Sequence, residues 1–327
     1  MAVTAKRHHY VPEAYLRAFT DGDGRLTVFR KDAPSTPFRT SPSDVALEQY
    51  YYAFTRSDEV RDTDSFEQIF SDIESGWPEI INRLKSGDVS DEVTHDLLQF
   101  ACLQRARVPA VRDAYEIMRA DSVGHIARLL QRMGKLPDAP PDSKDILDRV
   151  EISIDPESSL EAIALTLDGM VERVLPTLGF RIIHNRTRIS FVTSDNPVMW
   201  FIPYKNENEI KPYEMIPGAP MEFLFPLTPR LILLGTKQHS TEFREQGLLH
   251  GTLTNLETVK RANRLIAKFA YNAVFSEDES PSALVKKYAD VSPVAHSTSF
   301  PRPDGDMIMV HMEFSSRRTK AKWHQPA

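Results

Sequence analysis

The middle of the chain, residues 62–134, most constrains the fold because its apolar residues recur every three or four positions. That spacing places them on one face of a helix. Capping residues and glycines divide the region into a first helical stretch that ends before Gly87, a helix over residues 91–107 and another from Pro109 to about residue 133. Pro78 interrupts the first stretch, where it can kink the helix or begin a new one.

Segments typical of β-strands lie on both sides of this helical region. We expect three hairpins, at residues 25–30 with 37–40, 180–184 with 189–193, and 221–227 with 230–236. Further strands are expected at 150–154 and 307–314, and further helices at 157–177 and 253–269. Separate groups of strands and helices predict an α+β fold with an N-terminal β-hairpin module, a helical middle and an antiparallel sheet flanked by helices.

The same pattern suggests how the chain is divided. Residues 1–60 would form the hairpin module packed on the rest, 61–134 the helical region, and 144–314 the α+β region. Several prolines make residues 135–143 the clearest boundary, although the long helices could join all parts into one continuous domain. Residues 315–327 form a basic tail that we expect to be mobile.

Composition narrows the class of protein. The 327 residues are 41% hydrophobic and 26% charged, as in a folded globular protein. A net charge of −6 argues against a generally basic nucleic-acid binder, although a local basic groove remains compatible with it. The one cysteine, Cys102, lies in an apolar run and predicts a buried thiol, without an intrachain disulfide or a cysteine-rich zinc site. No signal peptide or membrane span is evident, so we expect a cytoplasmic protein without membrane contact.

The opening stretch, residues 6–19, concentrates unusual chemistry: two histidines, a tyrosine and basic residues precede an apolar run. Its His8-His9-Tyr10-Val11-Pro12 sequence, followed by Tyr15, Leu16 and Phe19, resembles the opening of a bacterial family catalogued as domain of unknown function 4238. The resemblance covers roughly residues 5–276 and recurs at residues 104–109, 193–198, 225–227 and at Asn263. It implies no activity, but it implies that these segments contribute to one site.

His8 and His9 would point to opposite faces of an extended segment. The family pattern ends in His-Tyr-Val-Pro, which favours His9 as a general base or metal ligand. The alternative is a histidine that only packs and hydrogen-bonds. Tyr10 belongs to an aromatic and basic front region of the kind that binds single-stranded nucleic acid, although tyrosines in short strands are also common as half-buried packing residues.

Two further polar groups are candidates for the same site. Gln104 and Arg107 share a helix face and could hold a phosphate or carboxylate, or Arg107 could satisfy the helix end or pair with a glutamate. Asp195 and Asn196 follow a buried-looking strand. Catalytic carboxylates occur at such ends, and so do Asx-turns.

Three glutamates could supply carboxylates to His9 or, with Asp195, to a divalent metal. Glu67 and Glu74 lie seven residues apart on one helix face, and Glu48 follows an apolar run. The alternatives are solvated helix faces or an ion pair with Arg107. Phosphate loops, Gly-x-Gly-x-x-Gly, His-Glu-x-x-His and Gly-x-Ser-x-Gly motifs are absent from the sequence.

Together these residue types favour a phosphodiesterase or nuclease of a bacterial defence or toxin type. His9, Glu48, Glu67 and Asp195 would be catalytic; Tyr10, Gln104, Arg107 and Asn196 would bind the substrate. A divalent metal is compatible with them, nucleic acid is the expected partner, and the oligomeric state is not indicated. The alternatives are a non-catalytic binding module for a small anionic ligand or partner protein, and a buried polar network in which every member is satisfied. Convergence of His9, Arg107 and Asp195 in one open pocket would support an active site, whereas wide separation or convergence in a closed core would argue against an enzyme.

Overall fold

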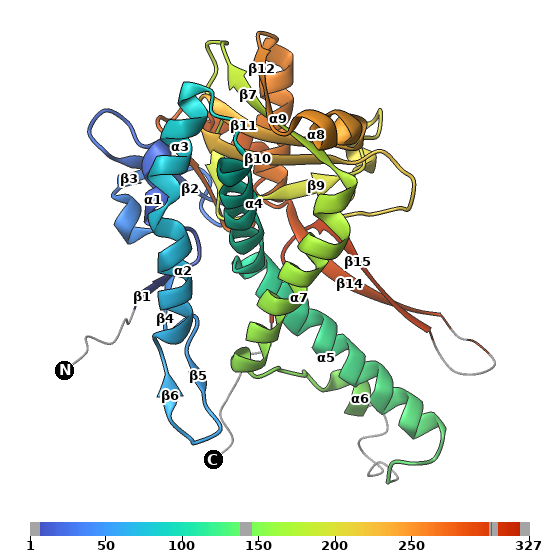
Figure 1. The fold of residues 1–327 in the computed structure, drawn as a ribbon. Helices are drawn as coiled ribbons and strands as arrows, with labels where there is room; N and C mark the ends of the chain where they lie inside the picture. Colours follow the sequence, from blue (N-terminus) through green and yellow to red (C-terminus); the bar gives the residue numbers. More distant parts are fainter. Residues whose placement is uncertain (1–6, 138–145, 301, 303–306, 321–327) are drawn as a thin grey trace.

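The computed structural model describes residues 7–137, 146–300, 302 and 307–320, and its fold is α+β (Figure 1). The strands are β1 Arg7–His9, β2 Leu26–Arg30, β3 Phe38–Thr40, β4 Leu47–Gln49, β5 Phe54–Thr55, β6 Arg61–Asp62, β7 Gly179–Asn185, β8 Thr193–Ser194, β9 Met199–Phe201, β10 Glu222–Thr228, β11 Leu231–Thr236, β12 Leu249–Leu253, β13 Ala273–Ser276, β14 Ser292–Phe300 and β15 Met307–Ser315. The helices are α1 Glu13–Leu16, α2 Ser65–Ser75, α3 Trp77–Ser86, α4 Asp91–Ala106, α5 Pro109–Arg132, α6 Ile146–Arg149, α7 Glu161–Gly169, α8 Ser240–Gln246, α9 Leu256–Phe269 and α10 Ser282–Lys287.

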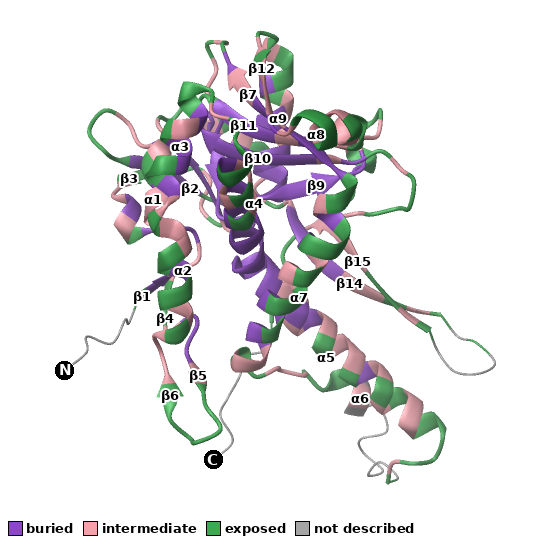
Figure 2. Ribbon diagram, in the orientation of Figure 1, coloured by how far each residue is buried: buried purple, intermediate pink, exposed green. Residues whose placement is uncertain are grey.

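A five-stranded sheet, in the order β12-β7-β11-β10-β9, carries the core on both faces. Side chains alternate across a strand. Phe223 and Phe225 therefore join the cluster that includes α4, whereas Leu224 and Ile232 join the cluster on α9. Strands β9, β10 and β11 and most of the second half of α4 are buried, whereas the β5–β6 hairpin and the far end of α5 are intermediate or exposed (Figure 2). The fully buried α4 end thus lies where residues 104–107 can contact several elements.

The first and third predicted hairpins are confirmed. β2 pairs antiparallel with β3, and β10 pairs antiparallel with β11. β2 also pairs with β13, giving a four-stranded sheet in the order β3-β2-β13-β8. The N-terminal hairpin therefore shares a sheet with strands from the second half of the chain.

The second predicted hairpin is wrong. β7 pairs with β11 and, in parallel, with β12, while β8 pairs with β13. The side chain of Asn185 instead holds a local turn, accepting from the backbone N–H of Thr187 at 2.9 Å and donating to the carbonyl of Ile189 at 2.7 Å. This turn leads the chain to the other sheet, and the β7–β12 pair makes the five-stranded sheet mixed rather than purely antiparallel.

Two strand predictions near the ends of the second half have different outcomes. Residues 150–154 form no strand, so that prediction is wrong. Residues 307–314 lie in β15, which pairs along its length with β14, a strand that the sequence pattern did not reveal. The long β14–β15 hairpin packs against α5.

The helical middle is confirmed, with a break at Gly76 between α2 and α3. Pro78 occupies the first turn of α3, where its missing N–H has no cost, so it begins a segment rather than kinking one. Ser90 caps α4 by accepting from the backbone N–H of Val93. The helix expected at 157–177 is a succession of 3₁₀, α, π and 3₁₀ turns from Pro156 to Thr177.

The basic tail pairs with acidic residues of α5 over its described part, and its mobility stays a prediction. Arg318 pairs with Asp121 at 2.9 Å, and Lys320 pairs with Asp113 and, at 2.6 Å, with Glu116. Residues 321–327 lie outside the described residues. Among the described helices, none has the length and apolarity needed to cross a membrane.

Candidate functional site

The strand β1 separates the two adjacent histidines, as expected for extended backbone. β1 pairs with β4, with His8 opposite Glu48 and His9 opposite Leu47. His8 is fully buried, accepts a 2.9 Å hydrogen bond from the backbone N–H of Tyr52 and stacks on that ring. His8 is therefore a structural residue, and His9 faces the other way.

His9 borders an open pocket of about 720 Å³ between α1, α2 and α3. The pocket brings together the imidazole and three carboxylates from segments far apart in the sequence. Its lining comprises His9, Glu13, Ala14, Arg17, Ala18, Glu67, Ser71, Glu74, Ser75, Trp77, Pro78, Ile81 and Asn82. We call it the His9 pocket.

Glu67 is the most perturbed acid of the His9 pocket. Partial burial, assisted by the negative charge of Glu74, raises its pKa to about 7, and the positive charge of Arg107 opposes the shift. Its carboxyl is therefore about half protonated at neutral pH. A group that titrates in this range can both give and accept a proton.

His9 is neutral at the same pH. Burial lowers the pKa of its imidazole, against the opposing effects of Glu13, the backbone of Ser43 and Glu74. Its Nε2 atom is shielded from water and has no hydrogen-bond partner among the described residues.

Arginines compensate the other two carboxylates of the pocket. Arg17 pairs with Glu13 at 2.7 Å on the exposed rim. Arg107, only 1% exposed, donates to Glu74 from behind the pocket. Because each of these carboxylates faces a guanidinium, the pocket is less negative than its three glutamates alone indicate.

Arg107 and Gln104 form a structural network rather than a substrate-binding fork. Besides Glu74, Arg107 donates to the Gln104 Oε1 at 3.3 Å, and Gln104 Nε2 donates to the Tyr10 carbonyl at 3.2 Å. The predicted shared helix face is confirmed, but both side chains are buried and occupied. The expectation that they hold a substrate anion is wrong, because Arg107 pairs with the carboxylate of Glu74 instead. Tyr10, whose carbonyl accepts from Gln104, is itself buried, and burial raises the pKa of its phenol.

Asp195 and Asn196 lie outside the His9 pocket, so the expected convergence of His9, Arg107 and Asp195 in one open pocket is wrong. Both are fully buried. Asp195 accepts from the backbone N–H groups of Tyr271 at 2.8 Å and Asn272 at 2.6 Å. Asn196 donates to Tyr213 and to the carbonyl of Phe269. Neither side chain is accessible to a substrate, because both satisfy buried groups of the protein.

Glu48 is also separate from the pocket. It shares a face of the β1–β4 pair with His8, opposite to His9, and lies near Arg112. Asn263, the late residue of the resemblance, bonds the backbone of Val192 and Ser190. Of the predicted catalytic residues, the structure therefore brings only His9 and Glu67 together.

The pocket also contains residues that were not predicted. Glu13 and Arg17 occupy i and i+4 positions in the short helical segment after Pro12, a spacing that could have revealed their ion pair. Ser71 and Asn82 carry no such signal because only the packing of α2 against α3 brings them together. Among the described residues, no three histidine, cysteine or acidic side chains are arranged to hold one metal ion.

Glu67→Gln is expected to stabilise the protein above pH 7 and to have no effect near pH 4. With a folded-state pKa of about 7, Glu67 contributes stability that is full below its unfolded pKa of about 4.3 and is lost as the pH rises through 7. Glutamine stays neutral throughout. Urea unfolding between pH 4 and 8.5 measures this, with exposed Glu79→Gln as the control. A difference in unfolding free energy between wild type and Glu67→Gln that did not vary with pH would contradict this prediction.

The structure also places Cys102 where it was expected. The thiol is buried in the core, and burial raises its pKa to about 11, so it remains protonated at neutral pH.

Comparison with known proteins gives one family match. Residues 7–280 match the family described as a protein of unknown function, DUF4238. The curated proteins and the solved structures gave no match to the chain.

Proposed function

The chain belongs to the DUF4238 family, and we propose that its His9 pocket is the active site of a phosphodiesterase that cleaves nucleic acid. The observation that carries this proposal is Glu67, whose pKa of about 7 occurs in an open pocket that also contains neutral His9. Cleavage of a phosphodiester needs one group that removes a proton from the attacking oxygen and one that protonates the leaving oxygen. Perturbed acids in pockets are the residues suited to this work.

Glu67 is the first choice for proton transfer. Its protonated form can give a proton to the leaving oxygen, and its ionised form can take one from water or a hydroxyl. His9 is the second choice, because its imidazole is neutral and Nε2 has no competing bond among the described residues, although that atom is shielded in this conformation.

The pocket can accept an anionic substrate despite its glutamates. Glu13 and Glu74 are each paired with an arginine, and Glu67 is half protonated at neutral pH. The Arg17 side chain is 70% exposed, and an exposed pair with Glu13 is weak enough to be exchanged for a phosphate. Ser71 and Asn82 add hydrogen-bond donors to the lining.

Incubation with end-labelled RNA and DNA, each with and without Mg²⁺, tests the proposal. Wild-type protein is expected to cleave one of them, and Glu67→Gln to reduce kcat about 100-fold or more, the usual minimum for losing a proton-transfer group. Exposed Glu79→Gln is the matched control and should cleave normally. The cleavage rate of His9→Ala tests whether His9 also transfers a proton.

The outcomes separate this function from its alternative. Glu67→Gln protein that cleaved as fast as wild type would remove Glu67 from the mechanism. Wild-type protein that bound the nucleic acid without cleaving it would favour a non-catalytic binding module instead.

A further inference from the structure

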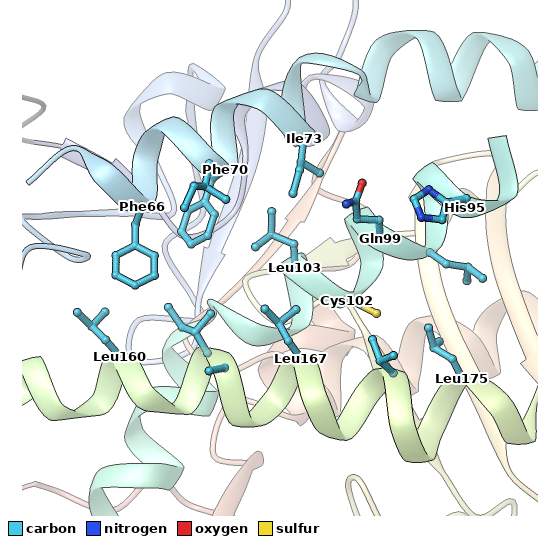
Figure 3. Close-up of a pocket in the computed structure, with 15 residues that line it drawn as sticks. Phe66, Phe70, Ile73, His95, Gln99, Cys102, Leu103, Leu160, Leu167 and Leu175 are labelled. Carbon is cyan, nitrogen blue, oxygen red and sulfur yellow. The ribbon is translucent and has the colours of Figure 1, made fainter. Parts of the chain in front are cut away.

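A second cavity lies on the other side of α2, and it has no part in the proposed chemistry. It is an open groove of about 720 Å³ between α2, α4 and the helical segment Pro156–Thr177. In Figure 3, Phe66, Phe70 and Ile73 of α2 point toward Leu160 and Leu167 across the groove. We call it the α2–α7 groove. Its lining comprises Phe66, Ile69, Phe70, Ile73, His95, Leu98, Gln99, Cys102, Leu103, Leu160, Ile163, Ala164, Leu167, Val171 and Leu175.

The groove is long and apolar. Its lining residues on the Pro156–Thr177 segment run from Leu160 to Leu175, a rise of roughly 20 Å for helical backbone. Only His95 and Gln99 interrupt an otherwise apolar surface. Apolar residues along it remain open to water, with Ile69 57% and Val171 53% exposed. An exposed apolar strip of this kind marks a binding surface.

The exposed charged residues next to the groove are mainly acidic. Exposed Asp72 precedes Ile73, and Asp168 and Glu172 follow Leu167 and Val171. α2 contains no lysine or arginine, the Pro156–Thr177 segment contains one, exposed Arg173, and the only one in α4 is Arg105, whose side chain is buried. The groove therefore combines an apolar floor with a mainly acidic rim.

We propose that the α2–α7 groove binds an amphipathic helix of a partner protein, with apolar residues on one face and lysines or arginines on its flanks. A helix of about 14 residues matches the length of the groove and satisfies its own backbone hydrogen bonds. Its apolar residues would bury against Ile69, Leu167 and Val171, and its cations would face Asp168 and Glu172. This inference is independent of the proposed nuclease activity.

The acidic rim disfavours the other occupants. A fatty acid or an anionic membrane would bring negative charge against Asp72, Asp168 and Glu172. A second copy of the chain, placed symmetrically groove to groove, would bring two acidic rims together. The basic tail of the same chain is held on α5 over its described part.

Fluorescence anisotropy with two designed peptides tests this interaction. Both would be about 18 residues long, with leucine at i, i+3, i+4 and i+7, and their polar faces would carry lysine in one and glutamate in the other. The lysine peptide is expected to bind saturably, at least about tenfold more tightly than the glutamate peptide. Asp168→Lys with Glu172→Lys is expected to reverse this preference.

A matched pair of variants separates groove binding from general attraction to an acidic surface. Ile69 lines the groove and Leu165 does not, yet they are 57% and 59% exposed. Ile69→Gln is expected to weaken lysine-peptide binding about tenfold, and Leu165→Gln to leave it unchanged. Circular dichroism melts verify that both variants fold.

Three results would overturn the proposal. The first is lysine-peptide binding that Ile69→Gln leaves unchanged. The second is a dimer, measured by light scattering, that Ile69→Gln dissociates. The third is sedimentation with phosphatidylglycerol vesicles that the same substitution abolishes.

Discussion

Asp195→Ala is expected to lower the free energy of unfolding by about 3–5 kcal/mol, the usual loss when one partner of a buried charged network is removed. Asp195 accepts two backbone hydrogen bonds, from Tyr271 and Asn272, and no part of it is exposed. Its charge also acts on the buried Lys31 at the end of β2. Removing the carboxylate leaves two buried N–H groups without their acceptor and removes the negative charge near Lys31.

Lys31 gives this prediction its sharpest control. The ammonium donates to the carbonyl of Ala270 at 2.6 Å and to the Ser292 hydroxyl at 3.3 Å, and burial lowers its pKa to about 7 despite the charge of Asp195. Lys31→Met together with Asp195→Ala should therefore cost less than the sum of the two single losses, because each single variant already removes the attraction between the two charges.

Urea unfolding at pH 7 of the three variants measures this coupling. Asp23→Asn serves as a surface control, since its pair with Arg39 is exposed and should change stability by no more than about 0.5 kcal/mol. A loss below about 1 kcal/mol for Asp195→Ala would contradict this account of the Asp195 network.

The helical middle could be predicted because its signals are local. The Ser90 cap, Pro109 and the three-and-four spacing of apolar residues depend only on neighbouring residues, and α4 and α5 begin where they indicate. Strand pairing is not local. The pattern of residues 180–184 and 189–193 fits strands, but it does not say which strand each one joins, and the Asn185 turn directs them to different sheets.

The site was predicted only in part for a similar reason. Glu48, Glu67 and Asp195 have the same chemistry, and only packing decides that Glu67 borders water while Asp195 is fully buried. Lys31, the charged neighbour of Asp195, is 164 positions away in the sequence, beyond any local pattern. The resemblance implied that these segments contribute to one site, but Asp195 and Asn263 lie outside the His9 pocket and bond the backbone of the core.

Arg107→Met is expected to lower the free energy of unfolding by about 2–4 kcal/mol, and the neighbouring Arg105→Met is not. Both side chains are buried, at 1% and 6% exposed. Arg107 bonds Glu74 and Gln104, so its loss leaves a partly buried carboxylate without a cation. The Nε and Nη1 atoms of Arg105 have no acceptor among the described residues, and burial lowers its pKa.

Comparing the two variants thus distinguishes the loss of a paired buried charge from the loss of an unpaired one. Arg105 lies over the rings of Tyr213 at 3.8 Å and Trp200 at 5.5 Å, a contact that methionine can partly replace. Arg105→Met should therefore leave stability within about 1 kcal/mol of wild type or raise it, because a methionine buries no charge. Urea unfolding of both variants measures the difference, and equal losses would contradict this account of Arg107.

Arg107→Met should also change the pKa of Glu67 in the His9 pocket, which a loss of packing alone would not do. The charge of Arg107 opposes the rise in the Glu67 pKa, so Arg107→Met should move that pKa above its value of about 7. The pH dependence of stability in Arg107→Met, compared with Arg107→Met carrying Glu67→Gln, isolates the titration of Glu67. An unchanged titration would mean that Arg107 holds Glu74 in place without tuning the acid that we assign to catalysis.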